Sequence, residues 1–390
     1  MTTDVLPTQS ASFELDDDHR AFRDVCRSFV EREVKPLVRD AERSGSFPSS
    51  LWAGLAKAGL LGVGHPEEYG GTGGGVLALT ILAEELARAC GGIAITPLVS
   101  SYMAAPHLAR FGTSEQKTKY LAPVLRGEQV AAIAVTEPGT GSDVAGIATR
   151  ATPVSDGWSI SGTKMFITNA GLADVLIVAA RTDDSGRHRG ISTFLVERAE
   201  PGMSLGQPLE KMGWHSSDTR EVFFEDCFVD NSRLLGVQGR GFHQIMEAFQ
   251  VERTVLAGMG LGLAEVALQD AVEYARARKA FGQAISKFQA IRHRLAMMRT
   301  NLEAARLITY QAAARFDHGH PDAAASVAMA KLLAARVACE VVDEAVQIFG
   351  GSGFMEETPI AMHYRDARIL RIGGGTDEVQ LDILAKQMDL

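Results

Sequence analysis

The sequence predicts a mostly helical α+β fold in three consecutive regions, because the hydrophobic periodicity changes twice along the chain. Apolar residues recur at helical spacing up to about residue 128, form short strand-like runs over 129–238, and return to helical spacing over 239–390. We therefore expect an N-terminal α-helical domain (1–128), a middle antiparallel β domain (129–238) and a C-terminal four-helix bundle (239–390). A chain of 390 residues is long enough for two or three domains.

The first region shows apolar residues at intervals of three and four, as expected for helices. The first such run contains Phe22, Val25, Phe29, Val30 and Val34. We expect Pro36 to end this helix, because proline lacks the amide donor that continues a helical ladder. Further helices are predicted over 49–58, 76–90, 97–111 and 114–126, the last with Ser114 as its N-cap.

The middle region contains short apolar runs without intervening helices, which favours a small antiparallel barrel or sandwich. Asp156-Gly157 is a typical hairpin turn between two of the flanking segments. Strands are predicted over 130–136, 158–161, 164–168, 175–181, 191–196 and 221–228.

The last region is rich in Ala and Leu and predicts long helices joined by short loops, which is typical of an antiparallel bundle. The predicted helices span 241–276, 287–316, 322–349 and 377–388.

Composition excludes several classes of function. A net charge of −9 argues against a nucleic-acid surface, and no run approaches the roughly 20 apolar residues of a membrane span. The first residues lack the pattern of a signal peptide, and the four cysteines are scattered, so we expect a cytoplasmic protein with reduced thiols. His318 and His320 could form a metal pair, but their Asp-His-Gly-His-Pro-Asp context favours a polar turn, and we expect no metal.

Several glycine-containing segments could hold a nucleotide without a Rossmann or Walker loop, neither of which is present. The loop Thr136–Asp143 follows a strand, and its glycines let the backbone approach a planar or phosphate-bearing ligand. Taken alone this loop reads as a surface turn. The segments 276–282 and 347–354 likewise read alone as a basic helix end and a helix C-cap.

Together these segments carry a resemblance to a known family. The run 131–146 resembles the flavin-binding signature of acyl-CoA dehydrogenases, and 164–169 resembles their second flavin strand, with Phe166 where many members have tryptophan. The segment 276–282, followed by Phe288 and Gln289, resembles the part by which one subunit reaches its neighbour's FAD. The segment 347–354 resembles the family's glycine turn for the adenine side of the cofactor. The resemblance covers nearly the whole chain, because five separated motifs agree with it and the predicted helices, strand domain and helical bundle follow in the family's order.

The resemblance implies an FAD enzyme that acts on a fatty or branched acyl-CoA, passes electrons to an electron-transferring flavoprotein, and assembles as a homotetramer or at least a dimer. It implies substrate contacts from Ser142, Arg253, Gly374 and Gly375. The cofactor-binding residues that it implies are Ile133, Val135, Thr136, Gly141, Ser142, Phe166, Ile167, Thr168, Arg278, Phe281, Phe288, Gln289, Gln347, Gly350, Gly351, Thr376 and Glu378.

The catalytic base is the main departure from the common family pattern. Most members carry it as a glutamate in the C-terminal turn, where this chain has Gly374. Glycine keeps the backbone N–H that would bind the thioester oxygen but supplies no carboxylate. Glu252 is the candidate replacement, because its helical neighbours are apolar and its position resembles that of the base in the long-chain and isovaleryl-CoA dehydrogenases. His215, where many relatives have arginine, also favours the long-chain type.

Other interpretations remain open. Glu252 could instead be a buried glutamate paired with a distant arginine. Glu265 is similarly isolated, but lies roughly 220° around the same helix. Asp377 and Glu378 are expected to cap the last helix and touch the cofactor, and are the next candidate bases. The alternative functions are an acyl-CoA oxidase or related flavin oxygenase, and a non-catalytic acyl-CoA-binding relative. Chain-length preference depends on packing around Ile95, Thr96, Val99 and Met103 and is not predicted.

Overall fold

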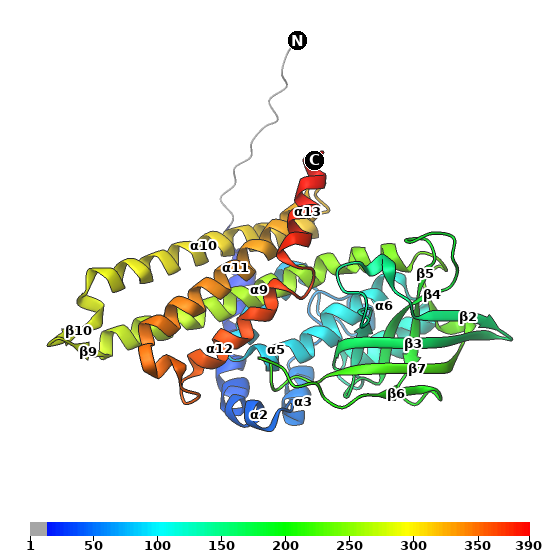
Figure 1. Ribbon diagram of the computed structural model, residues 1–390, viewed down its shortest axis with the longest axis horizontal. Helices are drawn as coiled ribbons and strands as arrows, with labels where there is room; N and C mark the ends of the chain where they lie inside the picture. The colour runs from blue at the N-terminus through cyan, green and yellow to red at the C-terminus, as the bar shows by residue number, and fades with distance from the viewer. Residues whose placement is uncertain (1–13) are drawn as a thin grey trace, which may run out of the picture.

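The computed structural model describes residues 14–390, and the first 13 residues, where we expect no signal peptide, lie outside the described residues. Figure 1 shows strands β2 to β7 gathered at one end of the molecule and the long helices α10 and α11 toward the other, where β9 and β10 also lie. Helix α9 runs from that end toward the sheet, and N-terminal helices pack between and beneath. The predicted order of helices, sheet and helical bundle is confirmed.

The first helix does not end at Pro36. Helix α1 (Asp17–Phe29), capped by Asp16, continues through a π-helical turn (Val30–Val34) and a 3-10 turn (Lys35–Leu37) into α2 (Val38–Ser44). The prediction is wrong because Pro36 lies at the start of the 3-10 turn, where a missing amide donor is tolerated.

The remaining N-terminal helices occur close to their predicted places. The segment predicted over 97–111 begins earlier, at Gly91, with Pro97 inside the helix. Thr113, not Ser114, is the N-cap of the last segment, because its side chain and that of Gln116 form a reciprocal capping box. The helices are α3 (Ser49–Lys57), η3 (Glu67–Tyr69), α4 (Gly75–Ala87), α5 (Gly91–Leu98), the π-helix η4 (Val99–Ala104), α6 (Ala105–Phe111), α7 (Ser114–Gln116), the π-helix η5 (Lys117–Leu121) and α8 (Ala122–Leu125).

The middle domain is a mixed sheet, not a purely antiparallel one. Its strands run in the order β6-β7-β3-β2-β4-β5-β8, and β1 pairs with β4. β4 is parallel to both β1 and β2, whereas the other pairings are antiparallel. The strands are β1 (Ala131–Ala134), β2 (Arg150–Val154), β3 (Gly157–Thr168), β4 (Val175–Arg181), β5 (Ile191–Glu197), β6 (Met203–Leu205), β7 (Thr219–Asp230) and β8 (Leu234–Leu235).

Two predicted strands, 158–161 and 164–168, are parts of the single irregular strand β3. The hairpin turn at Asp156 is confirmed, since Val154 pairs with Gly157 and Asp156 has a φ of 62°. The sequence did not reveal β2, β6 and β8.

The C-terminal helices match the prediction with one addition, α12, which the sequence did not reveal. Helix α11 packs against α9, α10, α12 and α13. Helix α9 is long and apolar enough to cross a membrane, but 78% of its most apolar window is buried inside the protein. The elements are η7 (Asn231–Arg233), α9 (Gly241–Ala277), β9 (Lys279–Ala280), β10 (Gln283–Ala284), η8 (Ile285–Lys287), α10 (Gln289–Asp317), α11 (Ala323–Phe349), η9 (Gly350–Phe354), α12 (Pro359–Arg368), η10 (Ile369–Arg371) and α13 (Asp377–Gln387).

A close contact between α4 and α9 sets the position of α9. A Cβ atom added at Gly258 would lie 2.6 Å from the carbonyl oxygen of Thr80, and one at Gly262 would overlap the carbonyl oxygen of Glu84. The two helices therefore approach at backbone distance, which requires glycine at both positions.

We expect Gly262→Ala to destabilise the protein by about 1–3 kcal/mol, because the added methyl group forces α4 and α9 apart. Thermal unfolding measures this loss. Gly54→Ala in α3 is the matched control, since its added methyl meets only ordinary contacts at 3.8 Å and alanine favours a helix. An unfolding temperature for Gly262→Ala equal to that of Gly54→Ala would contradict the close approach.

Candidate active site

The structure brings Glu252 of α9 together with the glycine turn at residues 373–375. A Cβ atom built on Gly374 would lie 3.5 Å from the Glu252 Oε1 atom. The Glu252 carboxylate therefore reaches the space where a side chain at residue 374 would begin. Its catalytic role remains a prediction, but the geometry that this role requires is present.

Glu252 has the electrostatic properties of a base rather than of an ion-pair partner. Burial raises its pKa to about 7, against the opposing charges of Arg253 and Lys331. The side chain is surrounded by protein yet partly exposed. Within residues 14–390 it forms no ion pair. A partly exposed carboxylate with a pKa near neutrality can accept a proton from a ligand beside it.

Glu265 has a different environment on the same helix. Its carboxylate lies 2.6 Å from the Arg306 guanidinium and 4.0 Å from that of Arg88. Burial opposes the shift, but Arg306 and Arg88 hold the pKa of Glu265 below its usual range. The alternative interpretation of Glu252 was a buried glutamate paired with a distant arginine. Glu265 has that environment.

The two other candidate bases are also less suitable. Asp377 is buried and accepts from Arg371 at 2.7 Å and from Arg336 at 3.0 Å. Burial opposes the shift, but these two arginines lower the pKa of Asp377. Glu378 is exposed in the first turn of α13. We expected these two acidic residues to cap α13, but its N-cap is Thr376, and both acidic residues lie in the first turn of the helix.

The turn itself is shaped by two glycines and held from outside. Gly374 and Gly375 have φ values of 65° and 96°, which residues with a side chain rarely adopt. Arg253, itself buried, donates from Nε to the Gly374 carbonyl at 3.1 Å. A Cβ at Gly374 would lie only 2.6 Å from Leu256 Cδ1, so Leu256 occupies the space next to the turn. The sequence had not indicated this role of Leu256.

One group of expected cofactor residues gathers at the ends of β1 and β3. The backbone N–H of Met165 donates to the Thr136 carbonyl at 2.9 Å, which places the 136–143 loop beside Phe166. Lys164 and Glu137 form a buried pair at 2.7 Å beneath the loop. The remaining members of this group are Ile133, Val135, Gly141, Ser142, Ile167 and Thr168.

This group leaves open space for a ligand. Phe166 is 60% exposed with a φ of 59°, so its ring points away from the sheet instead of packing. No atom lies within 4 Å of a Cβ built on Gly139 or Gly141, and Ser142 is exposed. A large exposed aromatic ring next to an open glycine loop fits a planar ligand.

A second group of expected cofactor residues lies far from the first. Phe281 is 95% exposed and meets Phe288 edge-on at 6.1 Å. Tyr274 stacks on Phe349 at 4.2 Å, which brings the end of α11 beside the end of α9. Figure 1 places this region, marked by β9 and β10, at the opposite end of the molecule from β2 and β3. The group comprises Arg278, Phe281, Phe288, Gln289, Gln347, Gly350 and Gly351, and one chain does not bring it to the first group.

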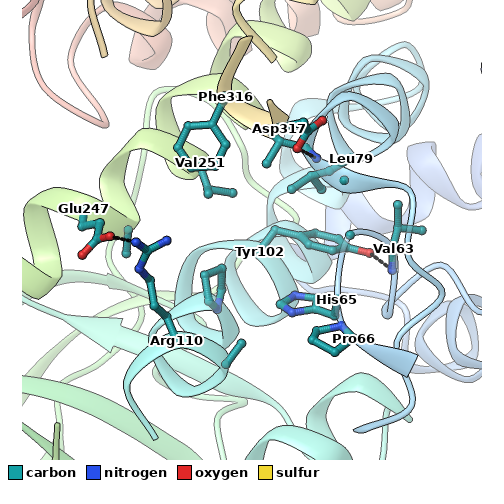
Figure 2. A pocket seen from close by; sticks show the side chains of 16 residues that line it. Val63, His65, Pro66, Leu79, Tyr102, Arg110, Glu247, Val251, Phe316 and Asp317 are labelled. Carbon is teal, nitrogen blue, oxygen red and sulfur yellow. Dashed lines mark hydrogen bonds and ion pairs between the residues drawn. The ribbon is translucent and has the colours of Figure 1, made fainter. Parts of the chain in front are cut away.

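Figure 2 shows a cavity that the sequence did not reveal, bounded by α4, α6, α9 and the end of α10. Its volume is about 250 Å³. Val251, next to Glu252 in sequence, is part of its wall, and an ion pair between Arg110 and Glu247 lies at one side. The residues expected to influence chain length (Ile95, Thr96, Val99 and Met103) are buried and do not line this cavity.

The expectation of a polar turn at residues 318–320 agrees with the structure. His318 bonds to the Ala314 carbonyl at the end of α10, and both histidines are exposed. In the described part of the chain no group of three or more potential ligands could hold a metal ion.

His215 occupies a junction between domains. Its ring contacts the Lys211 carbonyl at 3.0 Å and lies 3.7 Å from the Glu42 carboxylate. This arrangement does not by itself distinguish the long-chain type from other types.

Comparisons with known proteins cover almost the whole chain. Residues 16–128, 132–227 and 239–389 match the family descriptions "Acyl-CoA dehydrogenase, N-terminal domain", "middle domain" and "C-terminal domain". The mitochondrial short-chain specific acyl-CoA dehydrogenase of Bos taurus is 39% identical over 97% of this chain and 92% of its own length.

Solved structures of related proteins superimpose on nearly the whole chain. Butyryl-CoA dehydrogenase from Megasphaera elsdenii superimposes with a TM-score of 0.94 at 40% identity, covering 97% of this chain and 100% of its own. The FAD complex of PigA superimposes with a TM-score of 0.93 at 30% identity, covering 97% of this chain and 99% of its own.

Proposed function

This chain belongs to the acyl-CoA dehydrogenase family, and we propose that Glu252 is the base with which it removes the α-proton of an acyl-CoA thioester. The enzyme is an FAD-dependent oxidoreductase whose product is a trans-2-enoyl-CoA. The observation that carries the assignment of the base is the 3.5 Å separation between Glu252 Oε1 and the Cβ position of Gly374. The carboxylate approaches from α9 the point that relatives reach from the C-terminal turn.

Proton removal from the thioester requires a base and a hydrogen-bond donor from the protein. The α-proton is weakly acidic, so the base must be close and its pKa must be raised, as burial raises that of Glu252. Negative charge then develops on the thioester oxygen, and a backbone N–H can stabilise it. We assign this role to the Gly374 N–H, which needs no side chain.

The residues around the first cofactor group fit FAD. The exposed ring of Phe166 offers an aromatic face, and the open glycines of the 136–143 loop leave room for backbone contact. Ile133, Val135 and Thr136 would line the same side from β1, and Ile167 and Thr168 from β3. When bound, FAD supplies the acceptor for the β-hydride.

Anaerobic mixing of the FAD-loaded enzyme with an acyl-CoA panel tests this function. The relatives named above suggest beginning with short straight chains, and branched chains complete the panel. At least one thioester is expected to bleach the flavin. Bleaching by none of them would overturn the dehydrogenase assignment and favour a non-catalytic acyl-CoA-binding protein.

Admitting air after bleaching distinguishes the two enzyme classes. We propose that an electron-transferring flavoprotein is the acceptor, so reoxidation by oxygen alone should be slow and should accelerate when that flavoprotein is added. Rapid reoxidation in air without it would identify an oxidase.

We also propose a cytoplasmic homotetramer, or at least a dimer, because the two cofactor groups lie at opposite ends of one chain. A neighbouring copy could place Arg278 and Phe281 against the FAD held by β1 and β3. The guanidinium of Arg278 is exposed and suited to a pyrophosphate.

Arg278→Ala is accordingly expected to weaken FAD binding about tenfold or more, through loss of a charge-assisted contact. Titration of the apoprotein with FAD measures the affinity, and light scattering measures the assembly. Arg294→Ala, which removes a partly exposed arginine paired with Glu344 on the neighbouring helix, is the control. Unchanged FAD affinity in Arg278→Ala, or a monomer that binds FAD normally, would contradict the shared site.

A further inference from the structure

Lys331, on α11, is a buried lysine beside the proposed base that no sequence pattern had indicated. Its side chain is 0% exposed, and its Nζ atom donates to the Gly375 carbonyl at 2.5 Å. An ammonium group without solvent is costly unless it is hydrogen-bonded or paired with a negative charge. A lysine in this place therefore calls for an explanation.

Lys331 is one of several residues that hold the glycine turn in place. The carbonyl groups of the Gly374–Gly375 turn accept hydrogen bonds from three helices: Arg253 of α9 at 3.1 Å, Lys331 of α11 at 2.5 Å, and Gln380 of α13 at 3.3 and 3.1 Å. Two consecutive glycines in the left-handed region have no side chains with which to fix their own conformation. The three donors supply that restraint from outside.

The positive charge of Lys331 also acts on nearby ionisable groups. The charged groups that act on Lys331 are Asp377, Arg253, Glu252 and Arg371. Asp377 already accepts hydrogen bonds from Arg371 and Arg336, so its one negative charge is neutralised without the lysine. Gln380 provides a neutral donor to the same Gly375 oxygen. The hydrogen bond to the Gly375 carbonyl could thus be made by a neutral side chain, so it does not by itself require a lysine. Of the two carboxylates that act on Lys331, Glu252 is the one that forms no ion pair within residues 14–390.

We propose that Lys331 is a positioning residue for this reaction, which holds the Gly374–Gly375 turn over Glu252 and whose positive charge keeps the Glu252 carboxylate ionised. This inference rests on the proposed role of Glu252. Two observations support the electrostatic part: Arg253 and Lys331 are the charges that oppose the rise in the pKa of Glu252, and burial lowers the pKa of Lys331 to about 8.

The direct test replaces Lys331 by glutamine, which retains a hydrogen-bond donor and removes the charge. Flavin reduction by acyl-CoA is measured in single turnover between about pH 5.5 and pH 9. Without the charge the pKa of Glu252 rises further, so the acidic limb should move up by about one pH unit. The rate at about pH 6 should then fall about tenfold relative to wild type, with less than a twofold change at about pH 9.

Arg336→Gln is the matched control, because it removes a charge from the same helix, whereas the charges that act on Glu252 are those of Arg253 and Lys331. It is expected to leave the acidic limb unchanged. An acidic limb in Lys331→Gln that coincides with that of Arg336→Gln would overturn the proposal. If Glu252→Gln still reduces flavin at the wild-type rate, the assignment of the base fails first, which separates the two hypotheses.

A second measurement does not depend on a variant at residue 331 folding well. Coupling between two titrating groups is reciprocal, so Glu252→Gln should lower the pKa of Lys331. The Cε chemical shift of labelled lysines reports this midpoint in the holoenzyme. Lys164 is an internal control, because burial also lowers its pKa to about 8 but its partner is Glu137. Equal midpoints for Lys331 in wild type and Glu252→Gln would overturn the proposal.

Discussion

Glu252→Gln is expected to reduce the rate of flavin reduction by acyl-CoA about 10²–10⁴-fold while FAD remains bound. Glutamine has nearly the same shape but cannot accept the α-proton. Stopped-flow bleaching under anaerobic conditions measures the rate, and the flavin spectrum before mixing verifies the loading. The candidate bases Asp377 and Glu378 cannot compensate, since the first is held by two arginines and the second is exposed on α13.

The pH dependence of the wild-type rate should reflect the protonation of Glu252. Because burial raises the pKa of Glu252 to about 7, the carboxylate acquires a proton as the pH falls through that value. The rate should therefore decline below neutrality, approaching about tenfold per pH unit. The residual activity of Glu252→Gln should lack this limb.

Stability supplies a check that the variant is folded. The pKa of Glu252 in the folded protein lies above the ordinary value of 4.5, so ionisation destabilises the folded state as the pH rises between those values. Glu252→Gln should accordingly be at least as stable as wild type above neutral pH. Glu273→Gln, at an exposed position on the same helix, is a control whose rate should stay within about threefold of wild type. Wild-type rates in Glu252→Gln, or a large loss in Glu273→Gln, would refute the assignment of the base.

Moving the carboxylate to the position used by most relatives is expected to fail in this protein. In the double variant Glu252→Gly/Gly374→Glu, a side chain at residue 374 must adopt a φ of 65° and lie 2.6 Å from Leu256 Cδ1. Backbone strain and steric overlap should each cost about 1–3 kcal/mol. We expect a clear drop in unfolding temperature and no recovery of flavin reduction.

A third substitution identifies the cause of this failure. Adding Leu256→Ala removes the overlapping methyl group and should restore part of the stability of the double variant, measured by thermal unfolding. Gly373→Ala is the control within the turn, because its φ is not positive and only the Ile369 carbonyl lies near, at 3.7 Å. A double variant that unfolds like wild type and reduces flavin at a comparable rate would show that the turn accepts either base.

Local patterns predicted those elements whose periodicity agrees with their tertiary environment. Strand β4 was predicted with its observed limits, because it is an almost continuous run of buried apolar residues. Helix α9 was predicted to within one residue, because buried apolar residues recur along most of its length. Strand β2 was missed because exposed residues dominate it, and β6 and β8 because they have only 3 and 2 residues, too few to show a periodicity. Pairing with neighbouring strands makes these segments strands. The predicted helix boundaries at Pro36 and Pro97 were also wrong. Each proline lies within a continuous helical segment, next to a π-helical or 3-10 turn whose hydrogen-bond pattern differs from that of an α-helix.

The sequence by itself determined that a carboxylate at residue 252 stands among apolar neighbours and that the C-terminal turn has glycine where a base is usual. Both are properties of residue identity and order. The distance between them depended on the approach of α4 and α9, on Leu256, and on the donors from α9, α11 and α13 that hold the turn. Only the tertiary structure decided that Glu252 has no ion-pair partner among residues 14–390 while Glu265 is neutralised, because a carboxylate's pKa depends on the charges and solvent that folding brings around it.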